Sequence, residues 1–287
     1  MTTEAEAVRI FAPAKINLFL HVGGKRADGY HELESLVVFA STGDELTFDR
    51  AEELSLTIDG PFAGALARDP DNLVLKAARA LANYADVGQG ARIVLTKTLP
   101  VASGIGGGSA DAAGTLRGLA RLWNLNLTQD ELRKIGETLG SDVPVCIGCA
   151  PAWMEGRGEK VTELSGIPEV PMVLVNPGVA VPTGKVFAAL TERRGVGLVR
   201  PRAVNDARDL VAYLKTTAND LEAPARRMAP VIGEVLDALA AQPGALLARM
   251  SGSGATCFAL FESDAAAKNA ATAIGAQQRN WWAATAG

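Results

Sequence analysis

A glycine-rich stretch in the first half of the chain has the residue types that binding of a phosphate chain requires. From Pro100 to Asp111 the sequence reads Pro-Val-Ala-Ser-Gly-Ile-Gly-Gly-Gly-Ser-Ala-Asp, between an expected strand and an expected helix. Glycine lets backbone N–H groups approach an anion, and a helix start adds unpaired N–H groups and partial positive charge. The Ser109 hydroxyl can bind a phosphate oxygen or a magnesium ion. We therefore expect a phosphate-binding site here rather than a tight structural turn.

Two common nucleotide-binding motifs do not fit this stretch. The chain has no G-x-x-x-x-G-K-[ST] sequence, so the stretch is not a Walker A loop. A dinucleotide-binding fingerprint is also disfavoured. That motif needs a second strand after its helix, followed by an acidic residue, whereas here a helix leads to Thr128 and the acidic residue is missing.

Two charged residues outside the glycine-rich stretch are candidates for catalysis. Lys15 stands in an otherwise apolar strand, where burying its ammonium is costly without an anionic partner. Lysine is also a natural point-charge binder of phosphate, although an edge lysine facing water is the simpler alternative. Asp142 lies between a glycine and a Val-Pro pair, and by itself it is typical of a turn.

The hydrophobic pattern predicts the strands and helices that position these residues. One or two strands, interrupted by Pro13, are expected over 8–22. Further strands are expected over 33–39, 45–48, 54–58, 93–95, 170–177, 246–250 and 256–261. Helices are expected over 72–84 with Asn72 as the cap, after the glycine-rich stretch, from Gln129 behind a capping box, and over 182–190, 232–239 and 265–274. Because the strands cluster in the first third, the class is α+β.

Composition excludes several other classes of protein. The chain has 287 residues, 48% of them hydrophobic, and a net charge of −4, which argues against a nucleic-acid binder. The polar start Met1–Glu6 is unlike a signal peptide, and no apolar run is long enough to span a membrane. Three cysteines and two histidines are too few for a disulfide framework or a zinc site, so we expect reduced thiols and a cytoplasmic location.

Three motifs in the chain resemble those of the GHMP kinases, which include galactokinase, homoserine kinase and mevalonate kinase. They are Pro13-Ala-Lys-Ile-Asn-Leu, the glycine-rich stretch over 100–114, and Met250-Ser-Gly-Ser-Gly-Ala. Arg26-Ala-Asp-Gly-Tyr-His, Gly140-Ser-Asp-Val-Pro and Pro182-Thr resemble the subfamily that phosphorylates a cytidine-diphosphate-linked methylerythritol on the way to isoprenoids. Ala102-Ser103 departs mildly from the usual glycine pair, as Ile105 does from leucine.

The resemblance implies the fold and the residue roles. It implies a two-lobe GHMP kinase fold, with a ribosomal-protein-S5-like ATP-binding lobe over 1–160 and a ferredoxin-like lobe over 161–287. It makes Lys15 and Asp142 catalytic. ATP, with Mg²⁺, would contact Pro100, Val101, Ala102, Ser103, Gly104, Ile105, Gly106, Gly107, Gly108, Ser109, Ala110, Asn72 and Lys97. The substrate would contact Asn17, Tyr30, His31, Thr183 and Phe187, while Gly252-Ser-Gly supports the glycine-rich loop.

The expected partner is therefore a small-molecule substrate, with no nucleic acid and no membrane, and the protein is a monomer or a homodimer. The sequence does not identify the metal ligands. Two alternatives stay open at this point: another GHMP kinase acting on homoserine, a sugar or mevalonate, and a non-catalytic relative that keeps the fold as a binding module. The Arg26–His31 motif argues against the first, and the intact Lys15, Asp142 and glycine-rich stretch argue against the second.

Overall fold

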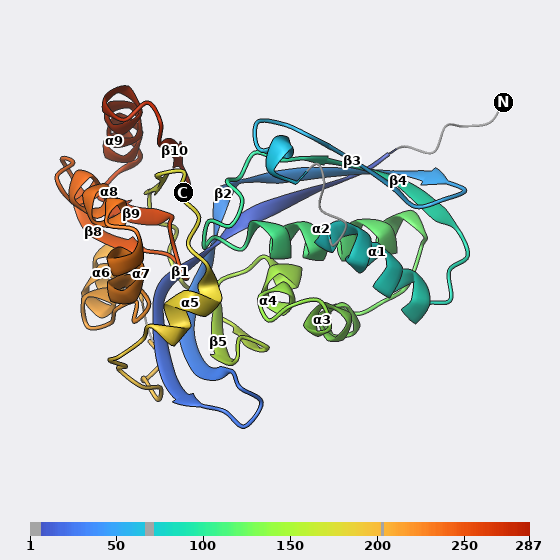
Figure 1. Ribbon diagram of the computed structural model, residues 1–287, viewed down its shortest axis with the longest axis horizontal. Helices are drawn as coiled ribbons and strands as arrows, with labels where there is room; N and C mark the ends of the chain where they lie inside the picture. Colours follow the sequence, from blue (N-terminus) through green and yellow to red (C-terminus); the bar gives the residue numbers. More distant parts are fainter. Residues whose placement is uncertain (1–6, 67–71, 202–203) are drawn as a thin grey trace. The chain divides into compact units, whose positions relative to one another are not determined.

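The computed structural model describes residues 7–66, 72–201 and 204–287 (Figure 1). The chain forms two compact units whose segments interleave: unit 1 is Met1–Ala14, Gly43–Val101 and Gly106–Cys149, and unit 2 is Lys15–Thr42, Ala102–Ile105 and Ala150–Gly287. The lobe boundary expected at residue 160 stays a prediction, and the polar start at 1–6 lies outside the described residues.

Unit 1 packs helices against one part of a sheet. Its strands are β3 (Ser55–Asp59), which is parallel to β4 (Gly90–Thr96), and the end of β2 (His31–Ala51), which is antiparallel to β4. Its helices are η1 (Ala63–Ala65), α1 (Leu73–Tyr84), α2 (Gly107–Leu122), α3 (Gln129–Glu137) and α4 (Val143–Gly148). A Cβ added to Gly118 of α2 would lie 2.2 Å from the Phe48 ring, so glycine lets α2 pack directly on β2.

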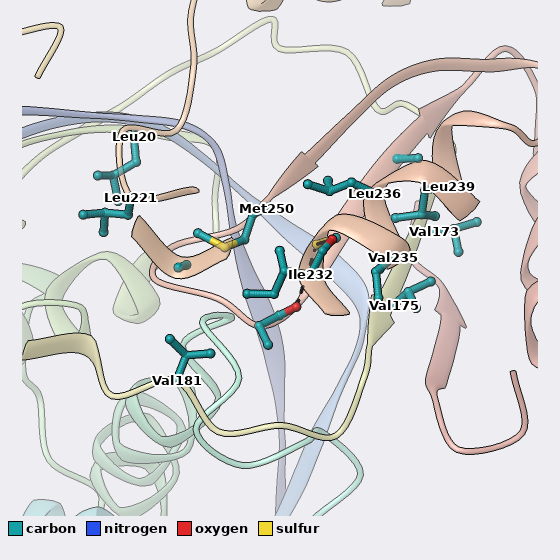
Figure 2. Packing of buried hydrophobic residues seen from close by; sticks show 14 of the residues in the cluster. Leu20, Val173, Val175, Val181, Leu221, Ile232, Val235, Leu236, Leu239 and Met250 are labelled. Carbon is teal, nitrogen blue, oxygen red and sulfur yellow. Dashed lines mark hydrogen bonds between the residues drawn. The ribbon is translucent and has the colours of Figure 1, made fainter. Parts of the chain in front are cut away.

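Unit 2 contains a four-stranded sheet in the order β10-β7-β9-β8. These strands are β7 (Met172–Asn176), β8 (Ala245–Met250), β9 (Cys257–Phe261) and β10 (Trp282–Thr285). The helices are α5 (Thr183–Ala188), α6 (Ala207–Lys215), α7 (Glu222–Met228), α8 (Val231–Ala240) and α9 (Asp264–Gln277). Aliphatic side chains of β7, α8 and the neighbouring loops form its core (Figure 2). Burial of such side chains drives folding.

A hairpin, the end of one long strand and the start of the next complete unit 2. β5 (Ala152–Gly156) pairs with β6 (Lys160–Glu163) on one side and with Leu33–Val37 of β2 on the other. β1 (Val8–Lys25) pairs with β2, and both strands contribute residues to both units.

Several expected elements are confirmed, and their capping chemistry explains their starts. The Asn72 side chain accepts a hydrogen bond from the Val74 N–H at 2.9 Å and caps α1. Thr128 and Glu131 form the expected capping box at the start of α3. The mixed arrangement of helices and mainly antiparallel strands confirms the α+β class.

Two expectations about strand limits were wrong. Pro13 does not interrupt β1, because β1 pairs with β2 outside the main order of the sheet, where a missing N–H is tolerated. β2 does not break between its two expected pieces: a Cβ on Gly43 would lie 2.4 Å from the Ala12 carbonyl oxygen, so this glycine marks a close approach of strands rather than a turn. The segment 156–166 holds the turn and the second strand of the β5–β6 hairpin.

The structure also contains helices that hydrophobic periodicity did not predict. These are α4, α6 and α7, which have six, nine and seven residues. Helices this short present too few turns for an apolar stripe to stand out. Within the described ranges no helix combines the length and the apolar character needed to cross a membrane.

Candidate active site

The glycine-rich stretch leads directly into a long helix of unit 1. Gly106 adopts a left-handed conformation with φ of 64°, and it occupies the N-cap position of α2 with no side-chain cap hydrogen bond. A helix start without a side-chain cap leaves its first N–H groups for another acceptor. The partial positive charge of the helix end favours an anion at the same point. The geometry therefore fits the phosphate site that the sequence predicts.

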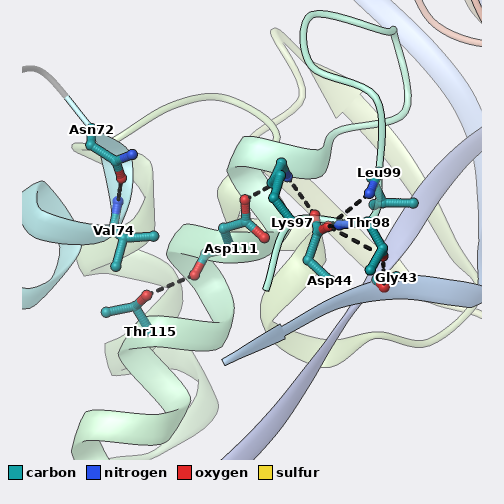
Figure 3. Close-up of polar contacts among 9 residues, drawn as sticks. All are labelled: Gly43, Asp44, Asn72, Val74, Lys97, Thr98, Leu99, Asp111 and Thr115. Carbon is teal, nitrogen blue, oxygen red and sulfur yellow. Dashed lines mark hydrogen bonds and ion pairs between the residues drawn. The ribbon is translucent and has the colours of Figure 1, made fainter. Parts of the chain in front are cut away.

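A buried ion-pair network lies beneath this helix start, as Figure 3 shows. The Lys97 ammonium donates hydrogen bonds to Asp44 Oδ2 and to Asp111 Oδ2, the latter at 2.7 Å. All three side chains are at most 3% exposed. Asp44 Oδ1 also accepts from the backbone N–H groups of Thr98 and Leu99, at 2.6 and 2.8 Å. The network therefore ties the end of β4 to β2 and to the first turns of α2.

The network carries one more negative than positive charge when all three groups are ionised. Burial lowers the pKa of Lys97, but the charges of Asp111 and Asp44 outweigh that effect and the net shift is upward. Burial, with the charge of Asp44, raises the pKa of Asp111 to about 7 against the opposing effect of Lys97. The Asp111 Oδ1 atom has no hydrogen-bond partner within the described part of the chain. Asp111 therefore takes up a proton near neutral pH.

The titration of Asp111 predicts a pH-dependent stability. Its pKa lies near 7 in the folded chain and at an ordinary 3.8 when unfolded, so the folded state binds the proton more tightly. The stabilisation is complete below pH 4 and is lost as the pH rises through 7. We expect the Tm of the wild type, relative to that of Asp111→Asn, to fall by roughly 4–8 °C between pH 5 and pH 8.

Scanning calorimetry of both proteins at four pH values makes this comparison. Asp130→Asn is the matched control, because the Asp130 side chain is 81% exposed, and its Tm difference from the wild type should not move in this range. A Tm difference for Asp111→Asn that is the same at pH 5 and pH 8 would contradict the account.

Lys97 and Asn72, two of the residues expected to contact ATP, both have structural partners in unit 1. The Lys97 side chain is held in the ion-pair network, and the Asn72 side chain caps α1. Leu73, the first residue of α1, lies beside the helix start of α2, since a Cβ on Gly108 would be 3.5 Å from Leu73 Cδ1. The contact of Asn72 and Lys97 with the nucleotide stays a prediction.

The catalytic lysine candidate is buried in unit 2, in the middle of β1. Lys15 is 3% exposed, and its ammonium donates a hydrogen bond to Asn17 Oδ1 at 2.9 Å. The Asn17 amide in turn donates to Ser35 Oγ at 2.8 Å. The backbone N–H of Lys15 donates to the Ile105 carbonyl at 2.9 Å, which joins β1 to the glycine-rich stretch. Lys15 is thus a buried strand lysine and not an edge lysine facing water.

The second glycine loop, Ser251–Gly254, supports the first by close backbone contact within unit 2. The Ser251 hydroxyl donates to the Gly104 carbonyl at 3.2 Å and accepts from the Asn17 N–H at 3.1 Å. A Cβ on Gly104 would lie 2.7 Å from the Gly254 nitrogen, so only glycine fits there. This confirms the supporting role expected for the loop.

Two of the residues expected to contact the substrate base stack on each other in unit 2. The rings of His31 and Phe187 have centroids 5.5 Å apart and planes 18° apart. Burial, with the charges of Arg193 and Lys25, lowers the pKa of His31, which favours the neutral imidazole near pH 7. A neutral imidazole has one donor and one acceptor, as reading the edge of a base requires.

Two further residues expected to contact the substrate, Tyr30 and Thr183, also belong to unit 2. Tyr30 is 52% exposed, unusual for so large an apolar ring, and it directly precedes His31. Thr183 begins α5, and its hydroxyl lies 2.8 Å from that of Ser253. Both side chains are thus exposed. Tyr30 lies next to His31 in the chain, and Thr183 shares α5 with Phe187.

Asp142 occupies the N-cap position of α4 in unit 1, with Pro144 in the first turn. Its side chain makes no cap hydrogen bond to that helix. Lys15 belongs to unit 2, so the expected approach of Lys15 and Asp142 stays a prediction.

The cysteines are reduced thiols, as the sequence predicts. Burial raises the pKa of Cys149 and of Cys257. A raised pKa keeps these thiols protonated and unreactive.

Comparison with known proteins identifies the family. The family model "GHMP kinases N terminal domain" matches residues 72–149, and "GHMP kinases C terminal" matches residues 198–280. A curated protein of Cereibacter sphaeroides, named 4-diphosphocytidyl-2-C-methyl-D-erythritol kinase, is 54% identical over 283 residues, which cover 96% of this chain and 97% of the relative. The chain belongs to the 4-diphosphocytidyl-2-C-methyl-D-erythritol kinases.

Other relatives agree with this membership. A protein of the same name from Parvibaculum lavamentivorans is 50% identical over 274 residues, which cover 94% of each chain. A crystal structure of 4-(cytidine 5'-diphospho)-2C-methyl-D-erythritol kinase superposes with a TM-score of 0.77 at 34% identity, covering 97% of this chain and 99% of the other. The GHMP kinase fold expected from the sequence is therefore confirmed.

In this member of the 4-diphosphocytidyl-2-C-methyl-D-erythritol kinases, the sequence motifs did not reveal the residues that hold the site together. Asp44 and Asp111 were not predicted, although Asp111 closes the glycine-rich stretch. Neither were Ser35 and Ser251, whose hydroxyls hold Asn17. The available signal was an acidic residue within a glycine-rich stretch and a lysine at the end of the preceding strand, which together indicate a buried pair.

Proposed function

We propose that this chain transfers the γ-phosphoryl group of ATP to a hydroxyl of 4-diphosphocytidyl-2-C-methyl-D-erythritol, in the methylerythritol phosphate route to isoprenoid precursors. The observation that carries this function is the identity of 54% over nearly the whole length of a relative with that name. Such identity over both family domains leaves little room for a different acceptor. The chain is an ATP-dependent kinase.

In this proposal the glycine-rich stretch binds the triphosphate of ATP. The uncapped start of α2 and the glycines at 106–108 supply backbone N–H groups without side chains in the way. Within the described ranges, no three His, Cys, Asp or Glu side chains are grouped to hold a metal ion. Magnesium would therefore be carried mainly by the phosphates, with the Ser109 hydroxyl near them, and it would neutralise charge on the transferred group.

Lys15 and Asp142 act on the acceptor hydroxyl in this proposal. An alcohol ionises far above pH 7, so attack on the γ-phosphorus benefits from a carboxylate that accepts its proton. The Lys15 ammonium would stabilise negative charge on the phosphoryl oxygens. Its hydrogen bond to Asn17, which Ser35 and Ser251 hold in turn, fixes the position of Lys15 in β1.

The cytidine moiety is read by the residues at the His31–Phe187 stack. Planar rings together with hydrogen bonds to a base edge are the usual means of reading a nucleobase. Tyr30, exposed and adjacent, completes this base site, and Asn17 and Thr183 would contact the polyol or its phosphates. The location is cytoplasmic, the partner is a small molecule rather than a nucleic acid or membrane, and the protein is a monomer or a homodimer.

His31→Ala tests the base site. We expect the KM for 4-diphosphocytidyl-2-C-methyl-D-erythritol to rise about tenfold or more, because the lost hydrogen bond and ring contact act on bound substrate and transition state alike. The kcat and the KM for ATP should stay near the wild-type values in steady-state assays.

A base-free substrate and a matched variant complete this test. Methylerythritol phosphate, which lacks the cytidine, should be a poor substrate of the wild type. Tyr84→Ala removes an aromatic side chain that is 51% exposed on α1, and it should leave the KM for the cytidine substrate unchanged. Equal kcat/KM for the two substrates would eliminate the cytidine site.

A further inference from the structure

The turn between β5 and β6 places one arginine against the exposed tyrosine of the base site. The Arg157 guanidinium carbon lies 5.5 Å from the centre of the Tyr30 ring. Guanidinium groups stack on aromatic faces and are attracted to their electron-rich centre. None of the motifs that indicate the activity includes Arg157.

The turn itself is built to present this side chain. Gly156 and Gly158, on either side of Arg157, both adopt positive φ, at 72° and 120°. The Glu159 carboxylate accepts a hydrogen bond from the Arg157 N–H at 2.7 Å and occupies the space that a Cβ on Gly156 would need. The backbone at Arg157 is thus fixed by its own turn rather than by the contact with Tyr30.

Strand register brings this turn to the base site. Gly156 pairs with Leu33 of β2, two residues after His31, where β2 begins. The backbone of Tyr30 is anchored separately, because its N–H donates to Asp28 Oδ1 at 3.1 Å and its carbonyl accepts from the Arg26 N–H at 2.7 Å. The two backbones are therefore held independently of each other, and the cation–π contact joins the Arg157 side chain to the Tyr30 ring.

We propose that Arg157 is a positioning residue for the nucleotide substrate, holding the Tyr30 ring in place for the base of a cytidine diphosphate. This rests on the proposed function, in which Tyr30 contacts the base. A half-exposed ring samples several rotamers, and holding one of them before binding lowers the ordering cost of the complex.

A double-mutant cycle of Arg157→Met and Tyr30→Leu tests this role, with affinity for cytidine diphosphate measured by calorimetry and KM by steady-state kinetics. We expect Arg157→Met to raise both the Kd and the KM for the cytidine substrate about three- to tenfold, as a partly exposed cation–π contact predicts. The kcat and the KM for ATP should not change. In the Tyr30→Leu background the same change should have an effect of less than about twofold, because the two residues act as one unit.

Two further variants separate the proposal from a general structural effect. Arg200→Met removes a similar stacking contact, 5.7 Å from the Trp153 ring, and should leave both constants unchanged. Arg157→Lys keeps the charge without the planar group and should recover part of the affinity. An undiminished effect of Arg157→Met in the Tyr30→Leu background, or unchanged constants in Arg157→Met alone, would overturn the proposal. The protein could bind cytidine diphosphate and give the expected double-mutant cycle without phosphorylating the cytidine-linked substrate. In that case the proposed function fails while the role of Arg157 stands.

Discussion

Replacing Asp142 by asparagine is expected to lower kcat by roughly 10²–10⁴-fold, the usual contribution of a positioned general base. The amide keeps the shape of the carboxylate but cannot accept the proton of the acceptor hydroxyl. Because the Asp142 side chain makes no cap hydrogen bond to α4, this change does not remove a cap that the helix uses. The KM for ATP should therefore stay close to that of the wild type.

Lys15→Ala extends the same experiment to the second catalytic candidate. It should also lower kcat, since the phosphoryl oxygens lose a buried positive charge. The double variant should lose less than the sum of the two single losses, because both groups serve one step. Asp237→Asn, on an exposed position of α8, is the control and should keep full activity. Near-normal kcat in Asp142→Asn would show that the carboxylate only orients the substrate.

Replacing Gly107 by valine is expected to weaken ATP binding by at least roughly 100-fold, equivalent to about two charge-assisted hydrogen bonds. A Cβ at this position would already lie 3.2 Å from Lys97 Nζ and 3.8 Å from Asp44 Oδ2. The branched side chain would therefore press on the ion-pair network beneath the helix start and occupy part of the phosphate path. Calorimetric titration with ATP and magnesium measures the effect.

The neighbouring glycine provides a matched control. A Cβ on Gly108 would meet only Leu73 Cδ1, at an ordinary 3.5 Å, so Gly108→Ala should fold normally and bind ATP more tightly than Gly107→Val does. Circular dichroism spectra and Tm values for both variants separate loss of binding from loss of fold. A folded Gly107→Val variant with unchanged ATP affinity would show that the phosphate chain of ATP does not bind at this helix start.

Local signals in the sequence predicted the elements whose chemistry is contained in a few neighbouring residues. The Asn72 cap and the Thr128–Glu131 box depend on residues two or three positions apart, and both were confirmed. Pro13 was expected to interrupt its strand, and the segment that contains Gly43 was expected to separate two strands. Whether such a residue interrupts a strand depends on which strand lies beside it in the sheet. The local sequence does not give this pairing.

The candidate site likewise contains residues that the sequence could predict and residues that it could not. The sequence places Lys15 in an apolar strand but leaves open whether it is buried or faces water at an edge, and the structure buries it. The ion pair of Lys97 with Asp44 forms because β2 and β4 pair with Glu45 opposite Thr96, and the sequence alone does not give this register. His31 and Phe187 are far apart in the chain, and only the family resemblance predicted them at one site, where they stack. Arg157 went unnoticed because a lone arginine in a glycine-flanked turn carries no local signal.

The most direct test of the central claim is a coupled ADP-release assay of the purified protein, with ATP and magnesium, on a panel of acceptors. The panel contains 4-diphosphocytidyl-2-C-methyl-D-erythritol, homoserine, mevalonate and galactose. The account predicts rapid ADP release with the cytidine-linked polyol and, with each of the other three, a kcat/KM lower by at least roughly 10⁴-fold, because the base site would be left empty. Faster release with homoserine, mevalonate or galactose than with the cytidine-linked polyol would contradict it.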